Sequence, residues 1–122
     1  MEQPALTMDV RQLEKLSVLQ DEEAPNLVAE MASGFLSRTA HRLCRLRELL
    51  AARDVVQIAH EAHGLATASG MFGMMRLRLD CKALENLARG SRLEELEPVL
   101  SQVEQSFAEA RPLLMAQLGL QD

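Results

Sequence analysis

Apolar residues recur along most of this chain at alternating intervals of three and four positions, and this spacing constrains the fold more than any other feature. The pattern is clearest between residues 74 and 88, where the apolar positions are Met74, Leu77, Cys81, Leu84 and Ala88. A helix turns once every 3.6 residues, so these positions share one face, which can pack against other helices. The spacing therefore predicts a helix with one buried face.

The composition of the chain also favours helices. Leu, Ala and Met number 22, 16 and 7 among the 122 residues, whereas Val, Ile and Thr together number 11 and the only aromatic residues are three Phe. Unbranched side chains suit helices, and the β-branched and aromatic side chains that suit strands are scarce. The composition argues against a β-sandwich, a barrel or a doubly wound sheet, and it predicts an all-α protein.

Local signals give the ends of the first helices. Asp9 opens a short helix that ends near Leu19, and Pro25 lies in the first turn of a second helix that ends near Ala52. Asp54 is the expected cap of a third helix, which ends at a tight connection between Gly70 and Gly73.

Further signals place the last two helices. Gly90 is expected to close the fourth helix in the left-handed conformation, and Ser91 with Glu94 forms a capping box for the fifth. Pro98 and Pro112 are expected to kink the fifth helix or to delay its start. The sequence thus predicts an antiparallel up-down four-helix bundle with a short extra N-terminal helix, and its length assigns residues 1–122 to a single domain.

Charge is distributed unevenly along the chain. Residues 1–35 carry 2 basic and 7 acidic side chains, residues 36–92 carry 10 and 5, and residues 93–122 carry 1 and 6. The three segments therefore have net charges of −5, +5 and −5, which suggests an acidic partner for the middle segment. Alternatively, the charges interleave and cancel on the folded surface.

The same sequence indicates a cytoplasmic protein. No apolar stretch is long enough to span a membrane, and Glu2, Pro4 and Asp9 interrupt any signal peptide. Cys44 and Cys81 lack the close spacing of a metal or redox motif, so we expect both to be reduced core residues.

The segment with the most chemical information runs from Ala59 to Gly70 and contains two histidines. At about 100° per residue, His63 lies at the boundary between the apolar stripe and water, and His60 lies further out on the polar face. A boundary imidazole can have one nitrogen held by the protein while the other is presented outward, as a reactive histidine requires. Small residues one or two turns away should leave a bare docking patch around it, although such residues are also common in ordinary helix packing: Ala59, Ala66, Thr67 and Gly70.

Residues 62–85 resemble the signature of histidine-containing phosphotransfer (HPt) domains. The matching positions fall in register without a gap: Ala62, His63, Leu65, Ala68, Ser69, Gly73, Leu77, Cys81, Leu84 and Glu85. The order and lengths of the predicted helices also resemble the family over nearly the whole chain.

The resemblance implies a phosphorelay intermediate of two-component signal transduction. His63 would accept a phosphoryl group from an aspartyl phosphate on a receiver domain and pass it to another receiver. A neutral imidazole is a nucleophile at cellular pH, and phosphoryl transfer depends mainly on positioning and charge stabilisation. The partners implied are receiver domains of response regulators, a hybrid sensor histidine kinase, or both. Mg²⁺ is expected on the receiver, so the chain would be a carrier without turnover and without a cofactor of its own.

Two departures from the family pattern stand close to His63. The lysine expected three residues after the histidine is Ala66, and the following glycine is Thr67. Substitutes for the missing cation are His60 on the same helix and Arg76 and Arg78 on the facing helix. The alternative is a degenerate adaptor that binds a receiver or kinase without phosphotransfer.

Two other kinds of site fit the sequence less well. His60 and His63 diverge on the helix, and Glu61 does not complete a zinc-protease motif, so we expect no metal site. Basic residues could contact a nucleic-acid backbone, but the chain has no aromatic stacking platform, and an acidic receiver face is the more economical partner. These residues are Arg38, Arg42, Arg45, Arg76, Arg78 and Lys82. His41 lies between Arg38 and Arg42 in the sequence, and we expect it to be a surface residue.

Overall fold

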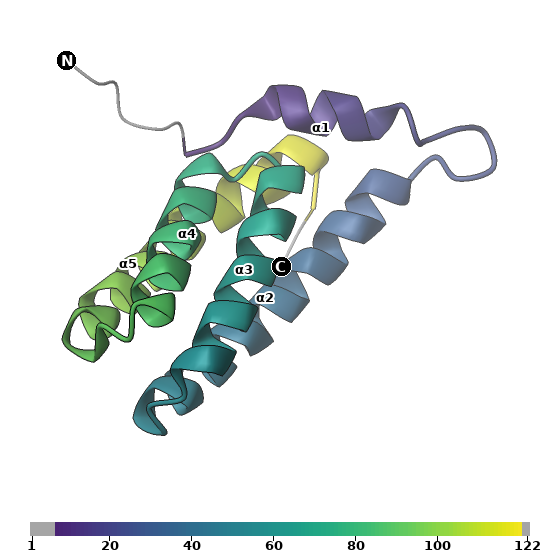
Figure 1. Ribbon diagram of the computed structural model, residues 1–122. Coiled ribbons are helices and arrows are strands. Elements are labelled where there is room, and N and C mark those ends of the chain that lie inside the picture. The colour runs from purple at the N-terminus through teal and green to yellow at the C-terminus, as the bar shows by residue number, and fades with distance from the viewer. Residues whose placement is uncertain (1–6, 121–122) are drawn as a thin grey trace, which may run out of the picture.

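The computed structural model describes residues 7–120, and this part of the chain contains five helices and no strand. They are α1 (Val10–Ser17), α2 (Leu27–Ala51), α3 (Val55–Met71), α4 (Met75–Arg89) and α5 (Leu93–Leu118). Figure 1 shows the four long helices side by side, with α1 lying across one end of them. The all-α fold class is confirmed. The predicted single domain extends over residues 1–6 and 121–122, which lie outside the described part, and stays a prediction.

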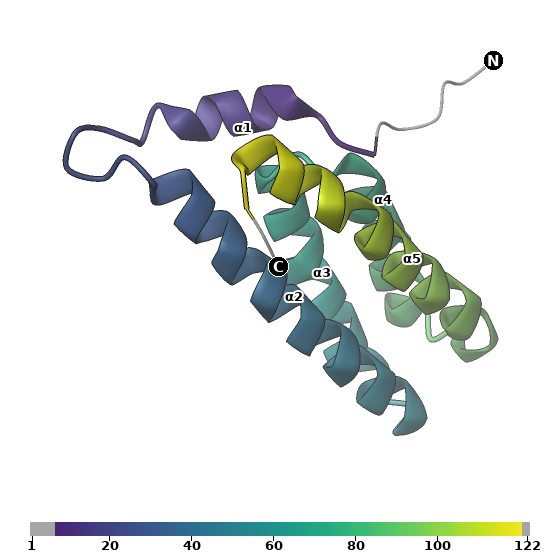
Figure 2. The ribbon, with the colours of Figure 1, turned by 180° about the vertical axis from the view of Figure 1, so that it is seen from behind.

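The long helices form a closed ring around one core. Helix α2 packs on α3, α3 on α4, α4 on α5, and α5 on α2. Figure 2 shows α5 from behind, alongside α4 with α2 on its other side. All five apolar residues of the predicted seam, from Met74 to Ala88, are buried in this core. The 3–4 spacing therefore corresponds to the inner face of the bundle.

Two predicted helix caps are present. The side chain of Asp9 accepts a hydrogen bond from Arg11 N at 3.1 Å, and that of Asp54 accepts one from Gln57 N at 3.2 Å. Each satisfies a backbone N–H that has no partner within its helix. The start of α2 differs from the prediction, because Pro25 precedes its first residue by two positions.

The connection between α4 and α5 is not the one that we predicted. Gly90 has a right-handed φ of −86°, whereas Ser91 has a φ of +55°. The hydrogen bond from Arg92 N to Leu87 O, at 3.0 Å, ends α4, and Ser91 is the left-handed residue of this helix end. Ser91 therefore cannot cap α5, which begins after Arg92 without a side-chain cap.

Helix α5 is continuous through both of its prolines, and its start is not delayed to Pro98. Pro98 and Pro112 are both exposed, so the rings project into water and not into the core. The carbonyl groups that lose a partner belong to residues four positions earlier, Glu94 and Ala108, which are also exposed. Water can hydrate these carbonyls, so the missing hydrogen bonds cost less than they would in the core.

The two cysteines have different surroundings. Cys81 is buried in the core, and burial raises the pKa of its thiol to about 12. Cys44 is exposed on α2, so its prediction as a core residue is wrong. Neither forms a disulfide. Within residues 7–120, no helix has the length and apolar character that crossing a bilayer requires.

Candidate functional site

His63 on α3 faces Glu85 on α4. The Nδ1 atom of His63 lies 3.1 Å from Oε2 and 3.3 Å from Oε1 of Glu85. The imidazole side chain is 60% exposed, whereas the carboxylate side chain is 10% exposed. One edge of the ring is therefore held against the bundle, and the rest of the ring is open to water.

The turn between α3 and α4 sets the register of this pair. Gly73 has a φ of +77°, and Met74 N donates a hydrogen bond to Ser69 O at 2.9 Å. A Cβ atom on Gly73 would lie 2.3 Å from the carbonyl oxygen of Asp9. Asp9 N also donates to Gly73 O at 2.7 Å, which fixes the start of α1 to the turn. Only glycine fits this position, since it has both a positive φ and no room for a side chain.

Glu85 also binds a cation on its own helix. Arg89 donates to Glu85 Oε2 from Nη2 at 2.7 Å and from Nε at 3.0 Å. These hydrogen bonds, with a further contribution from His63, hold the pKa of Glu85 below its ordinary value even though burial acts in the opposite direction. Glu85 is therefore ionised at neutral pH and accepts hydrogen bonds from both neighbours.

The ionised carboxylate decides which nitrogen of His63 can react. Because Glu85 can only accept, the hydrogen-bond network assigns the ring proton to Nδ1. The lone pair is then on Nε2, at the exposed side of the ring. A histidine with Nδ1 held by a carboxylate and Nε2 facing outward can act as a nucleophile toward a group brought by another molecule.

The expected patch of small residues around His63 is only partly present. Ala59 and Ala66 are 4% and 2% exposed, so they belong to the core and do not form part of an open surface. Thr67 is exposed, and its hydroxyl donates to His63 O at 3.2 Å. Gly70 is half-buried, and a Cβ atom there would lie 3.0 Å from Cδ of Arg78.

The remaining predicted site residues lie in different directions. His60 is exposed on α3, one turn before His63. Arg78 shares a face of α4 with Glu85, because seven residues make nearly two full turns. Arg76 is nine residues from Glu85, which places it on the opposite face of α4. The structure therefore places His60 and Thr67 about one turn from His63, places Gly70 and Arg78 about two turns away, and directs Arg76 elsewhere.

A groove begins one turn beyond His63. It has a volume of about 580 Å³ and runs between α3 and α4 to the edge of α1. Its lining residues are Gln12, Thr67, Gly70, Met71, Met75, Arg78 and Lys82.

Sequence reasoning missed the roles of Glu85 and Arg89. Both are visible in the sequence as a pair four residues apart, the spacing at which opposite charges meet on a helix. Glu85 also follows Leu84 at the edge of the buried seam, where a carboxylate needs a partner. In residues 7–120, no group of three or more His, Cys, Asp or Glu side chains is placed to hold a metal ion.

Comparison with known proteins identifies the family of the chain. The family model of the Hpt domain matches residues 30–112. Comparison with the sequences of curated proteins finds no match. The chain belongs to the Hpt domain family, because the matched segment spans more than half of it.

Solved structures share the fold over nearly the whole chain. Histidine-containing phosphotransfer protein B (HptB) from Pseudomonas aeruginosa PAO1 has a TM-score of 0.83 and 28% identity, with coverage of 95% of this chain and 97% of that protein. Yeast YPD1P has a TM-score of 0.88 and 13% identity, with coverage of 98% of each chain. Ypd1 of Saccharomyces cerevisiae, crystallised with the receiver domain of the response regulator Ssk1, has a TM-score of 0.68 and 14% identity, with coverage of 95% and 91%.

Proposed function

We propose that this chain is a phosphorelay intermediate in which His63 carries the phosphoryl group. The observation that supports this most directly is the arrangement of His63, whose Nδ1 is held by Glu85 while the rest of the ring is exposed. Phosphoryl transfer needs a positioned nucleophile more than it needs covalent chemistry from the protein.

The transfer step follows from this arrangement. Nε2 of His63 attacks the phosphorus of an aspartyl phosphate, so a P–N bond forms as the P–O bond breaks and the aspartate leaves as a carboxylate. The proton stays on Nδ1, and the ring becomes positively charged. Glu85 stabilises that charge through its hydrogen bond with Nδ1. Transfer to a second receiver reverses the same step.

We propose receiver domains as the partners. Support comes from the solved complex of Ypd1, a protein of the same fold, with the receiver domain of Ssk1. Mg²⁺ is expected on the receiver, and this chain would then act as a carrier without turnover of its own. We place the relay in the cytoplasm, where free thiols such as Cys44 and Cys81 stay reduced.

A degenerate adaptor is the second candidate, and one observation favours it. Helix α3 offers no cation one turn after His63, because Ala66 is buried and Thr67 is neutral. An adaptor would bind a receiver on this face without accepting phosphate.

Two histidine variants separate these functions. The protein is incubated with a phosphorylated receiver, and His63→Gln is compared with His60→Gln, which changes an exposed histidine one turn away. We expect an acid-labile, base-stable label that disappears only in His63→Gln. A label lost only in His60→Gln would contradict the assignment of the site, and tight receiver binding without any label would favour the adaptor.

A further inference from the structure

Two contacts fix the register between α3 and α4. His63 meets Glu85 through Nδ1, and Gly70 lies against the side chain of Arg78. The helices are antiparallel, so a step along α3 from His63 toward Gly70 corresponds to a step along α4 from Glu85 toward Arg78. Lys82 therefore lies opposite residues 66 and 67, about one turn from His63. Arg78, Lys82 and Glu85 follow one another on a single face of α4, at spacings of four and three residues.

Lys82 and Arg78 are half-buried cations that face the same groove. Both line the groove beside Thr67 and Gly70. Among residues 7–120, neither forms an ion pair with a carboxylate, whereas Arg45, Arg47, Arg89 and Arg92 each do.

The neighbouring carboxylates on α4 already have other partners. Glu85 is bound by Arg89 and His63, and Asp80 accepts a hydrogen bond from Ser106 of α5. Two positive charges thus face a groove next to the nucleophile, and no acidic group of α4 neutralises them. A phosphoryl group carries nearly two negative charges and three acceptor oxygens, which suits such a pair.

We propose that Lys82, with Arg78 beside it, binds the phosphoryl oxygens when the group is on His63. This inference rests on the proposed function of His63. It places the cation of the site on α4, which compensates for the buried Ala66 on α3. A lysine side chain can span roughly one 5.4 Å turn, the separation between Lys82 and the level of His63. The same groove would then hold the group during its transfer in either direction.

Phosphoramidate tests this without any receiver, because it donates a phosphoryl group directly to histidine. Labelling is followed by phosphorus NMR in the wild type, Lys82→Met and Lys82→Arg. Methionine keeps the length of the stem and removes the charge. We expect Lys82→Met to slow labelling about tenfold, in line with the loss of one charge-assisted hydrogen bond, and Lys82→Arg to restore it.

The matched control is Arg53→Met, which removes an exposed cation at the connection between α2 and α3, far from α1 in Figure 1. It should label at the wild-type rate. If Lys82→Met also labels at the wild-type rate while His63→Gln does not label, the role of Lys82 is wrong and the proposed function stands. If the wild type itself takes no label, the proposed function fails.

In that case inorganic phosphate tests whether the groove binds phosphate. It should shift the amide resonances of Thr67 and of residue 82 in the wild type but not in Lys82→Met. If the wild type shows no shift, the phosphate-binding role of the groove is wrong as well.

Discussion

The carboxylate of Glu85 contacts two groups that have different roles. Its oxygens accept from the Arg89 guanidinium, which is structural, and from Nδ1 of His63, which belongs to the candidate site. The side chain of Glu85 is nearly buried, so its carboxylate would be poorly hydrated if either partner were removed. Protonation of Glu85 would weaken both contacts at once.

The lowered pKa of Glu85 predicts a specific loss of stability in acid. A carboxylate with a depressed pKa in the folded state stabilises the fold fully above its ordinary value of 4.5, and this contribution is lost as the pH falls through the lower folded-state pKa. As the pH falls from 4.5 through the folded-state pKa, the free energy of unfolding of the wild type should therefore fall more steeply than that of Glu85→Gln, which cannot ionise.

Urea unfolding across a series of pH values measures this difference. Arg89→Met is the informative comparison, because Arg89 is the main cause of the lowered pKa, and its removal should move the acid-induced loss to higher pH. Parallel curves for the wild type and Glu85→Gln would contradict the prediction.

At the scale of elements, the turn between α3 and α4 depends on Gly73. Gly73→Ala would place a methyl group on the backbone of Asp9 and strain a residue with positive φ, so we expect a loss of about 2 kcal/mol in the free energy of unfolding. Gly119→Ala is the control, because Gly119 also has a positive φ, of 69°, but nothing lies within 4 Å of its Cβ position.

Urea unfolding of both variants separates the cost of a positive φ from the cost of the steric contact with Asp9. Gly119→Ala should lower the free energy of unfolding by about 1 kcal/mol, because only the positive φ disfavours alanine there. Equal losses in the two variants would show that the contact between the turn and α1 adds nothing.

The helices themselves were predictable because their signals are local. The 3–4 seam from Met74 to Ala88 and the caps at Asp9 and Asp54 depend on residues within one or two turns. The left-handed position after α4 did not follow from glycine preference, because the hydrogen bond from Arg92 N to Leu87 O places Ser91 there. The contact between His63 and Glu85 could not be predicted from the sequence either, since the two residues are 22 positions apart and their pairing depends on the geometry of the turn between α3 and α4.

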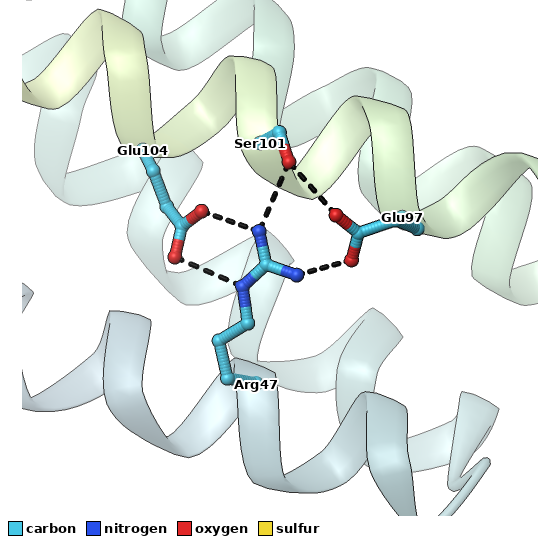
Figure 3. Close-up of polar contacts among 4 residues, drawn as sticks. All are labelled: Arg47, Glu97, Ser101 and Glu104. Carbon is cyan, nitrogen blue, oxygen red and sulfur yellow. Dashed lines mark hydrogen bonds and ion pairs between the residues drawn. The ribbon is translucent and has the colours of Figure 1, made fainter.

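Over the whole molecule, Arg47 joins the first and last long helices of the ring. Its guanidinium on α2 binds Glu97, Ser101 and Glu104 of α5, with Nε 3.0 Å from Glu104 Oε2 and Nη2 3.0 Å from Ser101 Oγ (Figure 3). Glu104 is the main cause that raises the pKa of Arg47 above its ordinary value. The three partners require a planar group with several donors.

Replacing Arg47 should therefore loosen the closure between α2 and α5. We expect Arg47→Met to lower the free energy of unfolding by about 1 kcal/mol, and Arg47→Lys to recover only part of this, because an ammonium cannot bridge all three partners. Urea unfolding at low and high salt measures the loss, which should shrink as salt screens the charges.

Arg45→Met provides the matched control, because the more exposed Arg45 forms one ion pair, with the half-buried Glu61 at 3.4 Å, among the residues that the structure describes. It should change stability by only a few tenths of a kcal/mol. If the two methionine variants lose the same stability, Arg47 does not hold the ring closed. The ion pairs of Arg47 with Glu97 and Glu104 also show that the charges of the basic middle segment and of the acidic last segment partly cancel on the surface.

The single open nitrogen of His63 has a consequence for timing. One imidazole with Nδ1 held by Glu85 presents one reactive atom, so a donor and an acceptor receiver cannot engage it together. The first receiver must dissociate before the second can associate, and each encounter is bimolecular. The flow of signal through this protein is then set by two dissociation rates and by the lifetime of the loaded histidine between them. A partner that stays bound after transfer would slow the relay as effectively as a defect in the chemistry.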